Sequence, residues 1–234
     1  MTLKERIAKW DLFLTDDQIE QFHMYCELLS EWNQVMNLTT ITDPEEVDLK
    51  HFTDSLALGV YFKPGRSTLI DVGTGAGFPG LALKIAFPEL EVTLADSISK
   101  RISFLDTVIR TLGLSGIRTI HGRAEDLARD PGLREQFDLC CARAVANLST
   151  LSEYCLPFVK CGGTFVAYKS EDVDEELAAA TKAIRKLGGS VERKVSYELP
   201  FSDVGRSLIF LKKTDPTPGQ YPRKAGTPSK KPLA

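Results

Sequence analysis

The chain of 234 residues is 43% hydrophobic and 26% charged, an ordinary composition for a folded globular protein. Its net charge of −3 argues against an unspecific nucleic-acid binder. No apolar run reaches the roughly 18 residues that span a bilayer, and the first residues lack the apolar core of a signal peptide, so we expect a cytoplasmic protein without membrane contact. The five cysteines form no C-x-x-C pair, which indicates reduced thiols and no zinc site.

Residues 1–62 are predicted to form an N-terminal helical segment. Thr15, followed by Gln18 three residues later, is typical of a capping box at the start of a helix. Apolar residues then recur at helical spacing from residue 19 to 36, which predicts one amphipathic helix.

A second helix is predicted to begin at Pro44 and to carry two polar side chains on one face. His51 and Asp54 are three residues apart, so they would lie one above the other. They would form either a polar cluster between helices or part of a binding site. We therefore count both as candidate substrate contacts.

The stretch 69–80 reads Leu-Ile-Asp-Val-Gly-Thr-Gly-Ala-Gly-Phe-Pro-Gly and is the most informative part of the sequence. An apolar strand ends at Asp71, and Pro79 is suited to the first position of a helix. Between them lie three alternating glycines, Gly73, Gly75 and Gly77. Glycines are favoured where the backbone adopts positive φ or lies directly against a ligand, so this strand, turn and helix predict a nucleotide-type cofactor site.

Two cofactor motifs overlap in this turn. Residues 75–80 fit the dinucleotide pattern G-x-G-x-x-G, whereas residues 71–77 fit the D/E-x-G-x-G-x-G loop of S-adenosyl-L-methionine (AdoMet) methyltransferases. A carboxylate at the end of the strand would repel a pyrophosphate, but it can help to hold the ammonium group of AdoMet. Asp71 therefore favours methyl transfer over dinucleotide binding. A turn without any ligand is disfavoured because three alternating glycines are costly unless something approaches them.

From residue 67 the chain alternates strands and helices, which predicts an α/β fold with a parallel sheet. The predicted strands are 68–72, 91–95, 116–121, 137–142, 163–168, 191–198 and 207–212. The predicted helices are 79–87, 100–112, about 125–135, 148–158 and 172–187. No helix fits between the last two strands, so they should form an antiparallel hairpin. We assign residues 63–213 to a class I AdoMet-dependent methyltransferase domain with a Rossmann-like, mostly parallel seven-stranded sheet. A doubly wound dehydrogenase would have six parallel strands.

In such sheets the ligand lies at the carboxyl ends of the strands, so the residues that follow each strand are site candidates. Asp96 follows the second strand and can accept hydrogen bonds from both hydroxyls of a ribose. Ala124 and Glu125 follow the third strand and can meet an adenine edge. The latter two also suit a helix start, where the helix dipole favours an acidic residue.

Basic residues also follow strands. Arg143, after the fourth strand, could hold the carboxylate of a methionine moiety or a substrate phosphate, and the sequence leaves both open. Lys169, after the fifth strand, is either a solvated lysine or a substrate contact. Arg123 is a further candidate substrate contact.

Some motifs of base methylation are missing from the sequence. There is no Asn/Asp-Pro-Pro-aromatic loop for an exocyclic amine, and Cys140 and Cys141 have no neighbouring proline, so we interpret them as small core residues. A ring nitrogen such as guanine N7 has an in-plane lone pair and needs alignment but no base. We therefore assign no catalytic acid or base.

Several motifs together resemble one family. They are Trp32-Asn-x-x-Met-Asn-Leu-Thr39, His51-x-x-Asp-Ser-Leu56, Asp71-Val-Gly-Thr-Gly-Ala-Gly-Phe-Pro-Gly80, Asp96-Ser-x-x-Lys-Arg101, Gly122-Arg-Ala-Glu125, Ala142-Arg-Ala144 and the tail motif from Tyr221 to Leu233. The family is the bacterial 16S ribosomal RNA guanine-N7 methyltransferase, also called glucose-inhibited division protein B. The resemblance implies AdoMet-dependent methylation of N7 of guanine 527 in the decoding-region loop of 16S rRNA. One departure is Lys169-Ser170, where many members have Lys-Gly.

The resemblance also implies that five residues contact AdoMet, namely Gly73, Phe78, Ala124, Glu125 and Arg143. With the residues argued above, the predicted cofactor-binding set is Asp71, Gly73, Gly75, Gly77, Phe78, Asp96, Ala124, Glu125 and Arg143.

Residues 214–234 form a basic tail rich in proline and glycine. Its prolines predict neither a helix nor a central strand, and such a composition is often disordered. The resemblance implies instead that the tail contacts rRNA phosphates through Arg223, Lys224, Lys230 and Lys231. Removing the tail is then expected to weaken RNA binding and to spare AdoMet binding.

Two alternative functions remain open at this stage. The first is a non-catalytic RNA-binding or ribosome-assembly factor on a methyltransferase scaffold, and the second is a NAD-type oxidoreductase. For the methyltransferase we expect a monomer without a metal ion, whose partner is 16S rRNA or the small ribosomal subunit.

Overall fold

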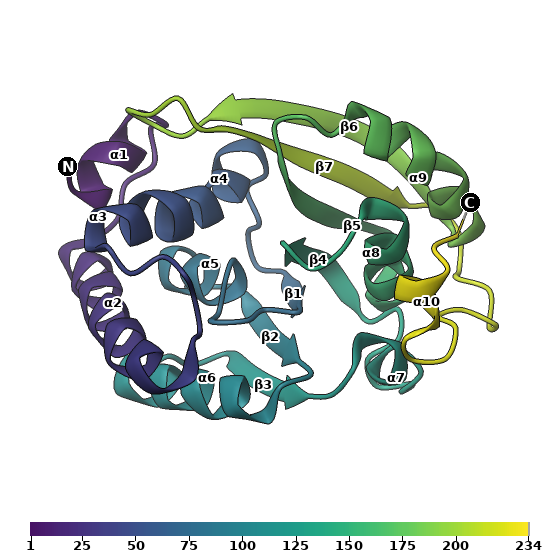
Figure 1. Ribbon diagram of the computed structural model, residues 1–234, viewed down its shortest axis with the longest axis horizontal. Coiled ribbons are helices and arrows are strands. Elements are labelled where there is room, and N and C mark those ends of the chain that lie inside the picture. Colours follow the sequence, from purple (N-terminus) through teal and green to yellow (C-terminus); the bar gives the residue numbers. More distant parts are fainter. Residues whose placement is uncertain (234) are drawn as a thin grey trace.

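Seven strands form one sheet in the computed structural model, which describes residues 1–233 (Figure 1). Their order across the sheet is β3-β2-β1-β4-β5-β7-β6. The strands are β1 Thr68–Val72, β2 Glu91–Asp96, β3 Ile117–His121, β4 Phe137–Arg143, β5 Val159–Ser170, β6 Gly189–Glu198 and β7 Gly205–Lys213. All seven predicted strands are present, some with shifted ends.

The direction of the strands agrees with the predicted fold class. β1 to β5 pair in parallel, whereas β7 runs antiparallel to both β5 and β6. The chain returns directly from β6 to β7, so the last two strands form the expected antiparallel pair. The sheet is therefore the Rossmann-like sheet of class I methyltransferases and differs from the all-parallel sheet of a doubly wound dehydrogenase.

Helices cover both faces of the sheet (Figure 1). Successive strand residues point to opposite faces, so Leu69 and Ile70 of β1 belong to two different apolar cores. Elements that pack on the Leu69 face are α1 Leu3–Ala8, α2 Asp16–Met36, α3 Pro44–Val47, α4 Asp54–Tyr61, α5 Gly80–Ala86 and α6 Ser99–Thr111. Elements that pack on the Ile70 face are α7 Ala124–Leu127, α8 Leu148–Cys155, the short 3₁₀ helix Leu156–Phe158 and α9 Asp174–Lys186.

The two adjacent cysteines of β4 confirm this alternation. Cys140 and Cys141 are fully buried in opposite cores, as expected for small core residues. Burial raises the pKa of both thiols well above the ordinary value, so neither is suited to act as a thiolate nucleophile.

The N-terminal helices follow the predicted capping signals. Thr15 accepts a hydrogen bond from the Gln18 amide, and the Gln18 side chain accepts one from the Thr15 amide, which confirms the capping box of α2. The sequence interpretation did not identify α1, although Thr2 and Glu5 form the same kind of capping box. After α3 the chain widens into a π-helix, Asp48–Thr53, before α4.

The predicted helix at about 125–135 is wrong in length. Only residues 124–127 are α-helical, and the chain then forms turns up to Glu135. Pro131 disfavours a helical conformation in the residue before it, and the Asp130 side chain accepts a hydrogen bond from the Gly132 amide at 2.8 Å, which stabilises a turn instead.

The tail folds back against the Ile70 face of the sheet (Figure 1, yellow). The Arg134 guanidinium donates to the carbonyls of Thr217 and Tyr221, at 2.7 and 2.9 Å. The tail also contains a helical turn, α10 Thr227–Lys230, so the expectation of no helix was wrong. Pro228 is tolerated because it lies in the first turn, where its missing N–H costs nothing.

No helix of residues 1–233 is long and apolar enough to span a bilayer. Within the same residues, no three His, Cys, Asp or Glu side chains gather in a way that could hold a metal ion.

Candidate functional site

The glycine-rich turn after β1 has the backbone conformation that its sequence predicts. Gly73, Gly75 and Gly77 all have positive φ, at 71°, 62° and 99°. A Cβ at Gly73 would lie 2.7 Å from a Val145 methyl carbon, so no larger residue fits there. A Cβ at Gly75 would meet no atom within 4 Å, so this face of the turn is open.

Asp71 lies behind the turn and does not line either of the two cavities described below. Its side chain is fully buried, and one carboxylate oxygen accepts hydrogen bonds from the Thr74 hydroxyl at 2.6 Å and the Gly80 amide at 2.8 Å. Burial raises the pKa of Asp71 to about 6, against the effect of these two hydrogen bonds. This carboxylate oxygen thus holds the turn from within, whereas Oδ1 has no hydrogen-bond partner among residues 1–233. The expected contact of Asp71 with an ammonium group stays a prediction.

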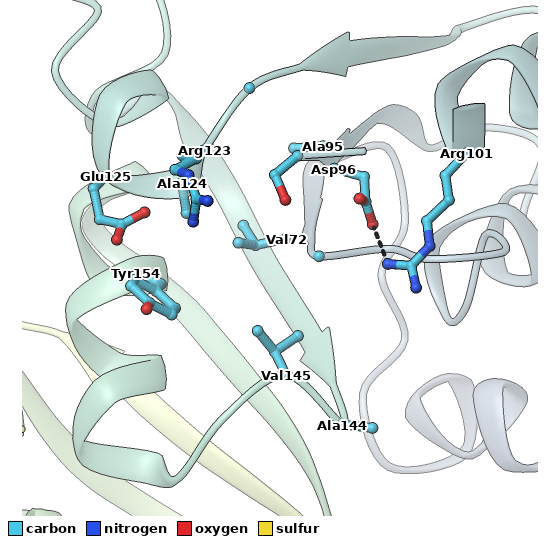
Figure 2. A pocket seen from close by; sticks show the side chains of 13 residues that line it. Val72, Ala95, Asp96, Arg101, Arg123, Ala124, Glu125, Ala144, Val145 and Tyr154 are labelled. Carbon is cyan, nitrogen blue, oxygen red and sulfur yellow. Dashed lines mark hydrogen bonds and ion pairs between the residues drawn. The ribbon is translucent and has the colours of Figure 1, made fainter. Parts of the chain in front are cut away.

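A small cavity of about 320 Å³ lies at the carboxyl ends of β1 to β4. Figure 2 shows Glu125 and Tyr154 on one side of it and Asp96 and Arg101 on the other. The lining also includes Val72, Gly73, Ala95, Ser97, Gly122, Arg123, Ala124, Ala144 and Val145. Three predicted cofactor residues after the second and third strands therefore meet in one cavity, as does Arg123.

Asp96 joins the end of β2 to the glycine-rich turn. Its carboxylate accepts hydrogen bonds from the amides of Gly75 and Ile98, both at 2.9 Å, and forms an ion pair with Arg101 at 3.3 Å (Figure 2). A carboxylate has about four acceptor positions, so Asp96 retains capacity for a ligand hydroxyl.

The tail supports the wall of the small cavity that lies opposite Asp96. The Glu125 carboxylate is buried and accepts a hydrogen bond from the Gly226 amide at 2.8 Å. Tyr154 of α8 and Val145 were not predicted as site residues, because neither belongs to a local motif that marks a ligand.

A large cavity of about 640 Å³ adjoins the small one. The two share Gly73, Arg101 and Ala144 in their linings. Basic side chains outnumber acidic ones in the large cavity, and they are Lys50, Arg101, Arg143, Lys169 and Arg206. Such a lining suits a ligand that carries phosphates.

Arg143 contacts three other predicted site residues at the large cavity. Its guanidinium lies 2.9 Å from the Asp54 carboxylate and 3.3 Å from Nδ1 of His51, and over the Phe78 ring at 5.1 Å from the centroid. The Arg143 side chain is only 13% exposed. His51 and Asp54 are thus parts of one polar cluster with Arg143, and the structure places all three at the wall of a cavity.

His51 is held as a neutral ring. It stacks on Phe78 with ring centroids 4.6 Å apart. Burial, together with the positive charge of Arg143, lowers the pKa of His51 to about 4. A ring with this pKa carries no charge at neutral pH.

Lys169 also belongs to the large cavity. Its ammonium lies 2.6 Å from the Glu176 carboxylate and donates to the Ala146 carbonyl at 2.8 Å. With a side chain only 12% exposed, it is not the solvated lysine that one interpretation of the sequence predicted.

The four basic tail residues differ in their surroundings. Arg223 is paired with the buried Glu153 of α8 at 2.7 Å, so it also has a role within the fold, and its predicted phosphate contact stays a prediction. Lys224, Lys230 and Lys231 are exposed. These three lysines are accessible to a partner, and their predicted contact with rRNA phosphates stays a prediction.

The small cavity fits the adenosine part of AdoMet. Asp96 supplies a hydroxyl acceptor, Tyr154 an aromatic ring, and Val72 and Val145 apolar walls. The open face of Gly75 leaves room at the glycine-rich turn for a ligand that a side chain would displace.

The sequence matches one protein family over most of its length. The family model GidB, described as rRNA small subunit methyltransferase G, matches residues 18–201. A ribosomal RNA small subunit methyltransferase G from Acetivibrio thermocellus is 53% identical over 231 residues, covering 99% of this chain and 95% of that protein. The protein of the same name from Listeria monocytogenes is 47% identical and covers 97% of this chain and 96% of its own.

Solved structures share the fold at low identity. The YcgJ protein of Bacillus subtilis has a TM-score of 0.53 at 17% identity, covering 69% of this chain and 98% of that one. The TYW2 protein of M. jannaschii, solved in complex with AdoMet, has a TM-score of 0.50 at 13% identity, covering 64% of this chain and 69% of its own.

Proposed function

Because this chain belongs to the rRNA small subunit methyltransferase G family, we propose that it transfers the methyl group of AdoMet to N7 of a guanine in 16S rRNA, guanine 527 by family resemblance. Its cofactor is AdoMet, as for the family.

The observation that carries the proposal is the junction of the two cavities. The small cavity fits a nucleoside cofactor, and the large cavity is rich in cations that suit an RNA phosphate. They adjoin at Gly73, Arg101 and Ala144, which line both cavities. A methyl group at this junction can pass from a donor in one cavity to a base in the other.

AdoMet, when bound, supplies an electrophilic methyl group on a sulfonium. The residues that would hold it are Asp96, Ala124, Glu125 and Tyr154 of the small cavity, with Gly73 and Gly75 of the turn. Gly77, which was also predicted to bind the cofactor, lines neither cavity: a Cβ there would lie 2.5 Å from the Tyr25 hydroxyl oxygen, inside the fold. Asp71, Thr74 and Gly80 keep the turn in shape through hydrogen bonds within the fold.

Guanine N7 needs orientation more than it needs a base, since its lone pair already lies in the ring plane. Phe78, His51 and Arg143 offer flat surfaces and donors at the wall of the large cavity. The low pKa of His51 leaves it a poor proton acceptor at neutral pH, which agrees with a reaction that transfers no proton to the enzyme.

The test is transfer of labelled methyl from AdoMet to small-subunit rRNA of a strain that lacks the enzyme, presented as naked 16S rRNA and as 30S subunits. We expect label in 7-methylguanosine, and loss of label with Gly75→Ala. Label in another nucleoside would overturn the guanine-N7 assignment. AdoMet binding without any methyl transfer would favour the alternative of a non-catalytic assembly factor.

A further inference from the structure

Thr39 is held firmly at the edge of the large cavity. Its amide donates to Oδ1 of Asn33 and its carbonyl accepts from Nδ2 of Asn33, both at 2.9 Å. Thr39 lies in the loop between α2 and α3 and lines the large cavity together with Arg143 and Phe78.

The Thr39 hydroxyl oxygen receives two hydrogen bonds, and their direction can be derived. The Ile41 amide donates to it at 3.0 Å. Nε2 of His51 lies 2.8 Å from it, and Nδ1 of the same ring lies 3.3 Å from the Arg143 guanidinium. Arginine can only donate, so Nδ1 is the acceptor of the ring. Nε2 therefore carries the proton of the neutral ring and donates it to Thr39.

This arrangement fixes the polarity of the Thr39 hydroxyl. A hydroxyl has two acceptor lone pairs and one hydrogen, and both lone pairs are already engaged. Among residues 1–233 we find no acceptor for its hydrogen. The hydroxyl can therefore act only as a donor toward a ligand in the large cavity.

We propose that Thr39 selects guanine over adenine by donating a hydrogen bond to O6 of the target base. On the edge that carries N7, guanine presents two acceptors, N7 and O6, whereas adenine presents N7 and an amino donor. A hydroxyl fixed as a donor would meet the adenine amino group as a second donor. The inference rests on the proposed function and adds the residue that determines the base.

The first experiment compares Thr39→Val, which keeps the side-chain shape, with Thr39→Ser, which keeps the hydroxyl. The substrates are reconstituted 30S subunits with either guanine or 2,6-diaminopurine at the target, since diaminopurine keeps N7 and replaces O6 with an amino group. For Thr39→Val we expect kcat/KM on guanine to fall about ten- to hundredfold, while the slow reaction on diaminopurine stays within about threefold of the original enzyme. Thr39→Ser should keep most of the preference.

The second experiment keeps Thr39 and replaces its hydrogen-bond donor, His51, with an acceptor. His51→Glu places an acceptor where Nε2–H was, so the Thr39 hydroxyl would donate to Glu and lose its donor role in the cavity. His51→Gln can still donate from its amide. We expect the guanine preference to be lost with His51→Glu and largely kept with His51→Gln, with AdoMet affinity measured by calorimetry as the control for folding.

An unchanged guanine preference in Thr39→Val, or an equal loss with both His51 variants, would overturn this inference while the proposed function stands. Absence of 7-methylguanosine with the unsubstituted enzyme would overturn the proposed function and the inference with it.

Discussion

The guanidinium of Arg223 donates two parallel hydrogen bonds to the carboxylate of Glu153, from Nε at 2.9 Å and from Nη2 at 2.7 Å. Glu153 has no exposed side-chain surface. The Arg223 amide donates to the same carboxylate at 2.7 Å. A basic residue of the tail thus neutralises a charge that lies inside the fold.

Arg223→Ala should destabilise the fold by about 3 kcal/mol, because it leaves the buried Glu153 charge without its partner. Urea denaturation followed by circular dichroism would measure this change. Lys224→Ala is the matched control, since Lys224 is the exposed neighbour, and it should change stability by less than about 0.5 kcal/mol. Similar stability of the two variants would contradict the role given to the Arg223–Glu153 pair.

The double substitution of Lys230 and Lys231 by alanine should weaken binding to 16S rRNA without changing the melting temperature. Both side chains are exposed, and each lysine that no longer neutralises a phosphate should reduce the slope of log affinity against log salt by about 1. Filter binding at several salt concentrations would measure the slope. Lys4 belongs to α1, which lies at the opposite end of the molecule from the tail (Figure 1), so Lys4→Ala should leave the slope unchanged. An equal effect of Lys4→Ala would indicate unspecific electrostatics.

Truncation of the whole tail would not test RNA binding alone, because the tail also supports the small cavity and the fold. Gly226 supports Glu125 in the small cavity, and Arg223 neutralises Glu153. We therefore now expect truncation to weaken AdoMet binding as well as RNA binding, in contrast to the expectation from the sequence.

Gly75→Ala should lower AdoMet affinity at least about tenfold, as measured by calorimetry, because a methyl group would occupy the open face of the turn. Gly113→Ala is a matched control. The φ of Gly113 is 63° against 62° for Gly75, and a Cβ on either would meet no atom within 4 Å. Both variants should lose about 1 kcal/mol of stability from backbone strain, but only Gly75→Ala should lose affinity. Equal affinity in the two variants would show that the turn does not contact the cofactor.

Asp71→Asn should flatten the dependence of stability on pH. The folded-state pKa of Asp71 is raised from 3.8 to about 6, so the folded protein holds this proton more tightly than the unfolded chain. The stability that this proton contributes is fully present below about pH 4 and is lost as the pH rises through about 6. The difference in unfolding free energy between the original protein and Asp71→Asn should therefore fall by roughly 1–3 kcal/mol across this range. Denaturation at several pH values from about 4 to about 6.5 would measure it, and a constant difference would contradict the raised pKa.

The sequence predicted the sheet well because its signals are local. Apolar strands such as 68–72 are bounded by glycine and proline, and the absence of a helix between β6 and β7 indicated the hairpin. The strand-end rule then brought Asp96, Ala124 and Glu125 to one cavity. The assignment of these residues to AdoMet, and the domain boundary at residue 63, stay predictions.

The sequence did not reveal features that depend on contacts between distant parts of the chain. The Arg223–Glu153 pair spans 70 residues, so local composition suggested a tail without fixed structure. Tyr154 reaches the small cavity only through the packing of α8. The burial of Asp71 follows from the way Gly80 closes over it, with Asp71 Cβ only 2.7 Å from where a Gly80 Cβ would be, and no spacing in the motif reveals this.

The contact between Gly226 and Glu125 has a consequence for biosynthesis. A ribosome translates residues 223–226 after all seven strands, so the sheet can form while the wall of the small cavity still lacks its tail partners. The nascent chain would therefore reach its cofactor-competent form only when the tail has left the exit tunnel and docked on α7 and α8. Chains that are cut short before Gly226 would carry the sheet and the glycine-rich turn but an unfinished cofactor pocket.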